Sequence, residues 1–236
     1  MAAEKIPRFY FSLRSPYSWL AYRELLDQYP DVAAAVEWRP FFEPDRESER
    51  MLTERGGSFP YAAMSRAKHL YVLQDVGRIA KERGVDLVWP VDKDPVWEIP
   101  HLAYLVALRG GQGPEFIAAA YRARWEEGRN ICDRSVIAGI GAGLGLDPAE
   151  FAGASDDPRL RAEGVRLLLD IDRDGVFGVP FFVHGFSRFW GLDRLPGFAA
   201  HLRARTAPAR GLPEPVAGAV GAGKRATDDG HAGGCG

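Results

Sequence analysis

Apolar side chains follow two different spacings at the start of the chain. Every second residue from Phe9 to Leu13 is apolar, which predicts a strand over residues 8–13. A proline then stands at a first-turn position, and apolar residues recur three and four apart, so we expect an amphipathic helix over residues 16–28. A second strand is predicted over residues 36–42. The chain therefore opens with a strand, a helix and a strand.

The middle of the chain has the patterns of helices alone. Acidic caps or first-turn prolines mark most of the predicted starts, and glycines mark several ends. We expect helices over residues 61–83, 99–109 and 114–127, after Asp133, after Asp147, and from Pro158 to about Asp174. Residues 45–174 are thus predicted to form an all-helical block.

Strand patterns return after residue 175. Residues 181–183 and 188–190 flank a turn and predict a hairpin. Asp193 is placed to open a last helix that runs to about Arg205. The expected fold class is α/β, in the order βαβ, helical block, ββα.

This order of elements predicts two structural parts. Residues 1–44 and 175–205 are expected to form the sheet-containing domain, and residues 45–174 an inserted helical domain. Residues 206–236 are rich in glycine and alanine and hold too few large apolar side chains to bury a core, so a disordered C-terminal tail is expected.

Composition and charge narrow the classes of function. Apolar residues make up 46 % and charged residues 26 % of the 236 residues, values typical of globular proteins. A formal net charge of -2 gives no bulk attraction to nucleic acid or to an anionic membrane. The sequence has no apolar run near the roughly 20 residues of a membrane-spanning helix and no secretory signal at its start. We expect a cytoplasmic protein without a nucleic-acid or membrane partner.

The two cysteines and five histidines have neither the spacing of a zinc site nor that of a disulfide framework, so no metal is expected. Cys132 is interpreted as a buried, inert thiol. Cys235 lies in the predicted tail, where nothing positions it for catalysis.

The segment Ser15-Pro16-Tyr17-Ser18 lies between the first strand and the first helix. The N–H groups that begin a helix are unpaired and favour an anion, so a thiolate held there would have a lowered pKa. The alternative is that Ser15 is only the N-cap of the helix.

Two further segments admit a binding or a structural interpretation. Val179-Pro180 precedes a strand and either forms a cis peptide bond or simply starts that strand. Asp193 either holds an ammonium group through a charge-assisted hydrogen bond or caps the last helix.

Taken together, the segments Phe9–Ala21, Gly175–Pro180 and Phe189–Arg194 resemble the 2-hydroxychromene-2-carboxylate isomerase family. That family is close to the kappa-class glutathione transferases, within the DsbA-like thioredoxin group. The resemblance covers about residues 7–205 and implies a thioredoxin-like fold with a helical insertion. It also implies that Ser15 and Ser18 stand where disulfide oxidoreductases have two cysteines, which excludes dithiol exchange at this site.

The resemblance implies a role for five residues of this sequence. Ser15 would stabilise the thiolate of bound glutathione, and the backbone of Val179 and Pro180 would pair with its cysteinyl part. Asp193 would hold the γ-glutamyl ammonium, and Lys68 would contact a carboxylate.

The sequence departs from the family in one place. The family often has Thr-Gly-Asn after the second strand, with an asparagine that binds glutathione, whereas residues 42–49 here are acidic and contain no asparagine. The expected cofactor is therefore glutathione or another low-molecular-weight thiol.

The resemblance implies a thiol-dependent cis/trans isomerase that acts on a conjugated aromatic, enone or keto-acid compound, with a homodimer as the assembly. Two alternatives remain open. A kappa-type transferase would use the same site to keep the thiol on its substrate, and a redox-inactive DsbA-like module would bind a partner without catalysis. Phe42, Trp89 and Trp97 are interpreted either as core or as the wall of a substrate pocket.

Overall fold

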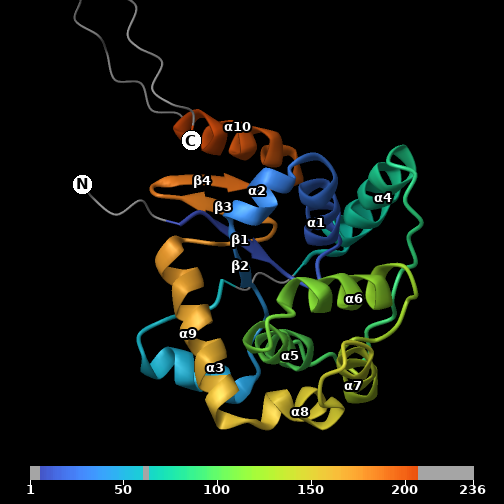
Figure 1. Cartoon of the computed structure of the whole chain (residues 1–236), viewed down its shortest axis with the longest axis vertical. Coiled ribbons are helices and arrows are strands. Elements are labelled where there is room, and N and C mark those ends of the chain that lie inside the picture. The colour runs from blue at the N-terminus through green and yellow to red at the C-terminus, as the bar shows by residue number, and fades with distance from the viewer. Residues whose placement is uncertain (1–5, 61–63, 207–236) are drawn as a thin grey trace, which may run out of the picture.

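A computed structural model describes residues 6–60 and 64–206 and contains one four-stranded mixed sheet (Figure 1). The strands are β1 (Arg8–Phe11), β2 (Glu37–Pro40), β3 (Phe181–His184) and β4 (Ser187–Trp190), in the spatial order β2-β1-β3-β4. Strand β1 pairs in parallel with β2 and antiparallel with β3, with Phe9 opposite Trp38 on one side and Phe182 on the other. The two central strands, β1 and β3, are therefore neighbours in the sheet although they lie far apart in the sequence.

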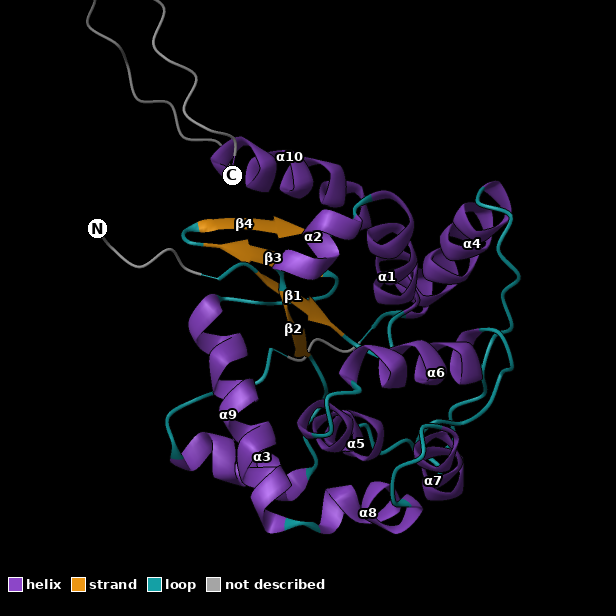
Figure 2. Ribbon diagram, viewed as in Figure 1, coloured by secondary structure: helices purple, strands orange, loops and turns teal. Residues whose placement is uncertain are grey.

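Ten α-helices surround or extend this sheet in the described residues (Figure 2). Between β1 and β2 in the sequence lie α1 (Pro16–Gln28) and α2 (Pro30–Ala35). Between β2 and β3 lie α3 (Arg46–Glu54), α4 (Arg66–Glu82), α5 (Glu98–Arg109), α6 (Gly113–Trp125), α7 (Arg134–Gly143), α8 (Pro148–Gly153) and α9 (Pro158–Asp174), together with the short 3-10 turn η1 (Ala154–Asp156). A second 3-10 turn, η2 (Leu192–Arg194), precedes α10 (Leu195–Thr206).

The core of the sheet is aromatic. Phe9 stacks on Phe182 with 4.8 Å between ring centroids, and Phe182 stacks on Phe198 of α10 at 4.9 Å. All three side chains are fully buried. Each aromatic side chain of this kind removes a large apolar area from water, which fixes α10 against the β3–β4 hairpin.

Most predicted elements are confirmed, and two helices have the predicted bounds. Helix α1 begins after its Ser15 cap with a proline at the first position, and α9 begins after the Asp157 cap and ends at Gly175, whose φ of 67° is left-handed. The six-residue helix α2 was not predicted. The prediction that Asp193 opens the last helix is wrong, because Asp193 lies inside η2 and α10 begins two residues later.

The predicted α/β fold class and the run of helices between the second and third strands are confirmed by this order of elements. The predicted tail, with Cys235, lies outside the described residues from residue 207 on. Within the described ranges, no helix is both long and apolar enough to cross a bilayer.

Candidate functional site

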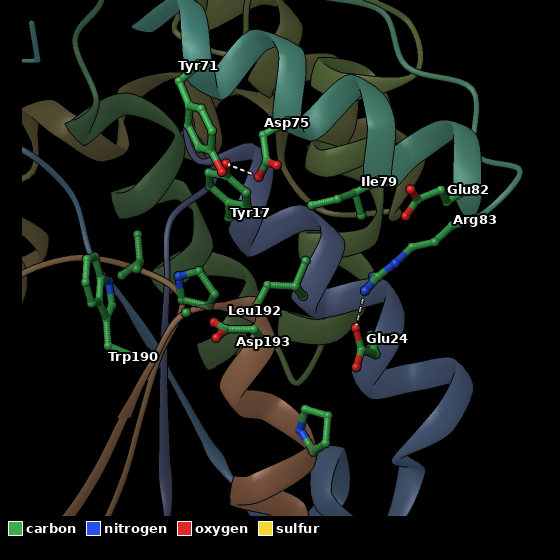
Figure 3. Close-up of a pocket in the computed structure, with 14 residues that line it drawn as sticks. Tyr17, Glu24, Tyr71, Asp75, Ile79, Glu82, Arg83, Trp190, Leu192 and Asp193 are labelled. Atoms are coloured by element: carbon green, nitrogen blue, oxygen red, sulfur yellow. Dashed lines mark hydrogen bonds and ion pairs between the residues drawn. The ribbon is translucent and has the colours of Figure 1, made fainter. Parts of the chain in front are cut away.

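A cleft of about 730 Å³ lies between α1, α4 and the segment around β4 and η2 (Figure 3). Two of its walls are helical, and the third includes the backbone that leads into β3 and out of β4. Its lining residues are Tyr17, Glu24, Tyr71, Asp75, Ile79, Glu82, Arg83, Val179, Pro180, Trp190, Gly191, Leu192, Asp193 and Pro196. The cleft thus joins three of the five residues predicted from the sequence, namely Val179, Pro180 and Asp193.

Ser15 is the N-cap of α1 and stands two positions before Tyr17, which lines the cleft. The Ser15 Oγ accepts a hydrogen bond from the Ser18 backbone N–H at 3.2 Å. A serine hydroxyl that accepts one hydrogen bond still has its own hydrogen to donate. The capping role and the predicted anion-stabilising role are therefore compatible. Ser15 does not line the cleft, whereas Tyr17 in the first turn of α1 does.

The loop that leads into Ser15 is held by buried hydrogen bonds. The Leu13 N–H donates to His101 Nε2 at 3.1 Å, and the Tyr121 hydroxyl donates to the Ser12 carbonyl at 3.2 Å. The Ser12 N–H donates to Ser18 Oγ, also at 3.2 Å. Since His101 lies on α5 and Tyr121 on α6, the helices between β2 and β3 position the start of α1.

His101 is fully buried and acts as an acceptor toward the loop. Its Nδ1 lies 2.6 Å from the Trp97 carbonyl, which accepts a hydrogen bond from Nδ1–H when Nε2 is unprotonated. Burial lowers the pKa of His101 to about 4, so the ring is neutral near pH 7 and keeps Nε2 free to accept. The sequence pattern offered no sign of this role, because the partners are 88 positions apart.

The Val179–Pro180 peptide bond is cis, which confirms one of the two interpretations made from the sequence. Both residues line the cleft. The indole of Trp190 packs against Gly178, the residue before Val179. A Cβ on Gly178 would lie 3.0 Å from the indole nitrogen. Glycine at position 178 therefore lets Trp190 lie against the backbone that enters the cis bond.

The glycine two positions before Asp193 leaves room for the Asp193 carboxylate. Gly191 has a φ of 108°, a conformation that L-residues rarely adopt. A Cβ at this position would lie 2.6 Å from Asp193 Oδ1. The Asp193 side chain is 74 % exposed, and the Arg194 Nε lies 3.5 Å from its Oδ2. The carboxylate is therefore open to a ligand at the cleft.

The α4 wall of the cleft is tied to α1 by two polar contacts. The Tyr17 hydroxyl donates to Asp75 Oδ2 at 2.7 Å, and the Arg83 guanidinium meets Glu24 Oε2 at 2.6 Å. The hydrogen bond from Tyr17, together with the Arg78 pair, lowers the pKa of Asp75, so this carboxylate is charged near neutral pH. The sequence analysis missed these pairs, because they join residues about 60 positions apart.

Lys68 lies exposed in the first turn of α4 and is not among the residues that line the cleft. The acidic segment of residues 42–49 has its own partners: Glu43 pairs with Arg14 at 3.0 Å and Asp45 with Arg161 at 2.8 Å. Glu43 therefore contacts the β1–α1 loop and Asp45 contacts α9, and neither residue lines the cleft.

Several other candidates lie away from the cleft. Phe42 and Trp97 are buried in the core, and Trp89 packs edge-on against Trp125. Burial raises the pKa of the Cys132 thiol to about 12, which keeps it protonated, as expected for an inert thiol. In residues 6–60 and 64–206, no group of three metal-ligating side chains could hold a metal ion.

Comparisons with known proteins agree with the fold described above. The family model for the DSBA-like thioredoxin domain matches residues 8–203. Two curated relatives named 2-hydroxychromene-2-carboxylate isomerase are similar: one from Sphingobium xenophagum is 27 % identical over 195 residues, 82 % of this chain and 96 % of its own, and one from Pseudomonas putida is 25 % identical over 188 residues, 79 % and 89 %.

Two solved structures have a similar fold. A structure of 2-hydroxychromene-2-carboxylate isomerase has a TM-score of 0.68 at 23 % identity, covering 85 % of this chain and 96 % of the other. The cytosolic disulfide reductase DsbM from Pseudomonas aeruginosa, with GSH, has a TM-score of 0.55 at 22 % identity, covering 84 % and 98 %. The resemblance stated from the sequence is thereby confirmed.

Proposed function

The chain belongs to the family of DSBA-like thioredoxin domains, and on this premise we propose that it is a thiol-dependent cis/trans isomerase. The substrate class is a small conjugated aromatic, enone or keto-acid compound. Support comes from the names of two curated relatives, 2-hydroxychromene-2-carboxylate isomerase, each matched over most of its length. The cofactor is glutathione or another low-molecular-weight thiol.

The observation that carries this proposal is the pair of hydroxyls at the start of α1. By the family resemblance, Ser15 and Ser18 stand where disulfide oxidoreductases have two cysteines, and a hydroxyl cannot undergo thiol–disulfide exchange. The helix N-terminus that favours an anion is kept, with Ser15 capping it through a 3.2 Å hydrogen bond. Such a site suits a sulfur that arrives with a ligand.

The residues around the cleft fit a small thiol. The Ser15 hydroxyl and the Tyr17 N–H can donate to a thiolate, whereas Pro16 has no N–H and the Ser18 and Trp19 N–H groups already donate to Ser15. The backbone at Val179 and Pro180 can pair with a peptide-like chain, and the open carboxylate of Asp193 can accept from an ammonium group. A bound thiol supplies reversible addition to a conjugated double bond, which permits rotation about that bond and consumes no oxidant or reductant.

The chain's own residues would act on the charge of the sulfur. Ser15 and the helix N-terminus stabilise the anionic sulfur and so favour its departure at the end of the cycle. The hydrogen bonds from Leu13 to His101 and from Tyr121 to Ser12 fix the loop before Ser15, so little reorganisation is needed when charge develops. Ser15 is the proposed catalytic residue, and His101 and Tyr121 are positioning residues.

Removal of small thiols tests this proposal. Dialysed protein is mixed with a geometric isomer of an aromatic enone or keto acid, and isomer composition is followed by chromatography with and without added thiol. We expect catalysed isomerisation only with thiol, and a rise in Tm when thiol is added, because a ligand that binds the folded state stabilises it. Turnover without any thiol would contradict the proposal.

Product analysis separates the isomerase from the runner-up activities. A thioether as the end product would establish the kappa-type transferase instead. Absence of both turnover and thiol binding would favour a redox-inactive binding module.

We also propose a homodimer and a cytoplasmic location, where small thiols are kept reduced. Light scattering tests the homodimer, and cell fractionation tests the location.

Gly191→Ala tests whether the position of Asp193 matters for binding. The new Cβ would lie 2.6 Å from Asp193 Oδ1 and would require a left-handed backbone, so the carboxylate is displaced. We expect thiol affinity to fall about 5- to 10-fold, the range of one weakened charge-assisted hydrogen bond. Gly153→Ala is the control, since nothing lies within 4 Å of a Cβ there. Calorimetry of amine-bearing thiols measures the change.

A further inference from the structure

The charged residues that line the cleft are mostly acidic. Four carboxylates, from Glu24, Asp75, Glu82 and Asp193, face one guanidinium, from Arg83. Figure 3 shows them distributed around the cleft, with Glu24, Glu82 and Arg83 at the right, Asp75 beside Tyr17 near the top and Asp193 next to Leu192 lower in the view. Among the described lining residues, Arg83 is the only cation.

Arg83 is already committed to another residue. Its guanidinium pairs with Glu24 at 2.6 Å and donates to the Leu20 carbonyl at 3.4 Å. The Glu24 side chain is only 7 % exposed. A ligand carboxylate that took Arg83 would leave a nearly buried carboxylate without its partner, which is costly. Arg83 therefore does not serve as a receptor for a ligand carboxylate.

Cations just outside the cleft neutralise the negative charge of its carboxylates only in part. Arg78 pairs with Asp75 at 2.9 Å and Arg194 with Asp193 at 3.5 Å, but both guanidinium groups are well exposed and screened by solvent. Lys68, which the family resemblance assigned to a carboxylate, is exposed and absent from the lining.

Apart from Tyr17 and Tyr71, which carry hydroxyls, the uncharged part of the lining is apolar. It consists chiefly of Ile79, Val179, Pro180, Trp190, Leu192 and Pro196. Trp190 remains 52 % exposed although it is a large aromatic side chain beside the cleft. Such a surface gains from contact with an uncharged chain and offers no positive charge to an anion.

We infer that the cleft selects its thiol by charge, taking one whose chain is uncharged or carries an ammonium group and disfavouring one with carboxylates. This inference rests on the proposed thiol dependence and names the class of thiol. Glutathione has two carboxylates and one ammonium, so it is a poor match in this respect. Its ammonium suits Asp193, while its carboxylates meet an acidic cleft.

The test compares glutathione with its diamide, in which both carboxylates are primary amides of nearly the same shape. Binding to the wild-type chain is measured by calorimetry at about 0.02 M salt, where charges interact over tens of ångströms. We expect the diamide to bind about fivefold more tightly, because the carboxylates of the cleft repel those of glutathione. Solvent between these groups weakens the repulsion, so the expected factor is modest. At about 0.5 M salt the ratio should fall below about twofold.

Glu82→Gln provides the matched variant, because it removes one cleft charge with almost no change in shape. The ratio of the two affinities should fall by about half. Glu150→Gln makes the same exchange on an exposed residue of α8, a helix with no residue in the lining of the cleft, and should leave the ratio unchanged.

Three outcomes are decisive. Equal or tighter binding of glutathione overturns the inference and leaves thiol dependence intact. A diamide preference that responds neither to salt nor to Glu82→Gln also overturns it, because charge is then not the cause. If neither glutathione nor the diamide binds and no thiol in a wider panel does, the proposed function itself fails.

Discussion

Replacing Ser15 with alanine is expected to lower thiol-dependent turnover by about 10- to 100-fold. The change deletes the hydroxyl that donates to the thiolate, and a lost hydrogen bond to a charged group costs about 1.5–3 kcal/mol. Each 1.4 kcal/mol or so corresponds to a factor of ten in rate. The measurement is kcat/KM for isomerisation at saturating thiol, together with the pH at which the bound thiol ionises. That pH should rise, since the anion has lost a donor.

The same substitution also removes a helix cap, so a control for stability is needed. Ser15 Oγ accepts from the Ser18 N–H, and loss of such a cap costs about 1 kcal/mol of folding free energy. Asp133→Ala removes the cap of α7, a comparable bond to the Ser135 N–H, away from the cleft. It should lower Tm by a similar amount and leave turnover unchanged. If Ser15→Ala loses no more activity than Asp133→Ala, Ser15 is a cap and nothing else.

Replacing His101 with leucine is expected to lower the free energy of unfolding by about 2–4 kcal/mol at neutral pH. The buried Leu13 N–H would lose its acceptor and the Trp97 carbonyl its donor, and each buried group left unsatisfied costs about 1–3 kcal/mol. Urea unfolding measures the loss. His101→Gln can restore one of the two hydrogen bonds and should recover part of it. A leucine variant as stable as the wild type would show that the two bonds contribute little.

The effect of His101 depends on pH in a definite direction. Its folded pKa of about 4 lies below the unfolded value of 6.5, so the unfolded chain binds the proton more readily between these pH values. The wild type should lose up to about 3 kcal/mol as pH falls from 6.5 to 4, at 1.36 kcal/mol per pKa unit. Carboxylates common to both proteins cancel in the comparison. The stability gap between wild type and His101→Leu should therefore narrow toward pH 4.

The sequence predicted the elements whose signals are local. Helix α1 has a serine cap, a first-position proline and a helical apolar spacing, and its predicted bounds match. Helix α2 escaped notice because its six residues include three alanines and only one buried side chain, so no apolar period is visible. Asp193 looked like a cap because an acidic residue preceded a helical run, whereas the glycine at 191 turns the chain into a 3-10 turn first.

The site was predictable only where a short motif marked it. The cis bond at Val179–Pro180 and the cap at Ser15 were each one of two interpretations that a proline before a strand and a serine before a helix allow, and the structure shows both features. The contacts that shape the cleft, such as Glu24 with Arg83, join helices whose mutual placement depends on packing across the whole chain. No local pattern reports such a pairing. The substitutions described above test the predicted roles of Ser15 and Asp193, whereas Lys68 is not among the residues that line the cleft.

The central position of β1 has a consequence for how this chain is made. One edge of β1 pairs with β2, which leaves the ribosome soon afterwards, but the other edge waits for β3, about 170 residues later. Translation at about 5–20 residues per second leaves that edge unpaired for roughly ten seconds or more. A nascent chain stalled before residue 181 would thus expose a phenylalanine-rich strand edge, and its solubility would depend on chaperones until the hairpin emerges.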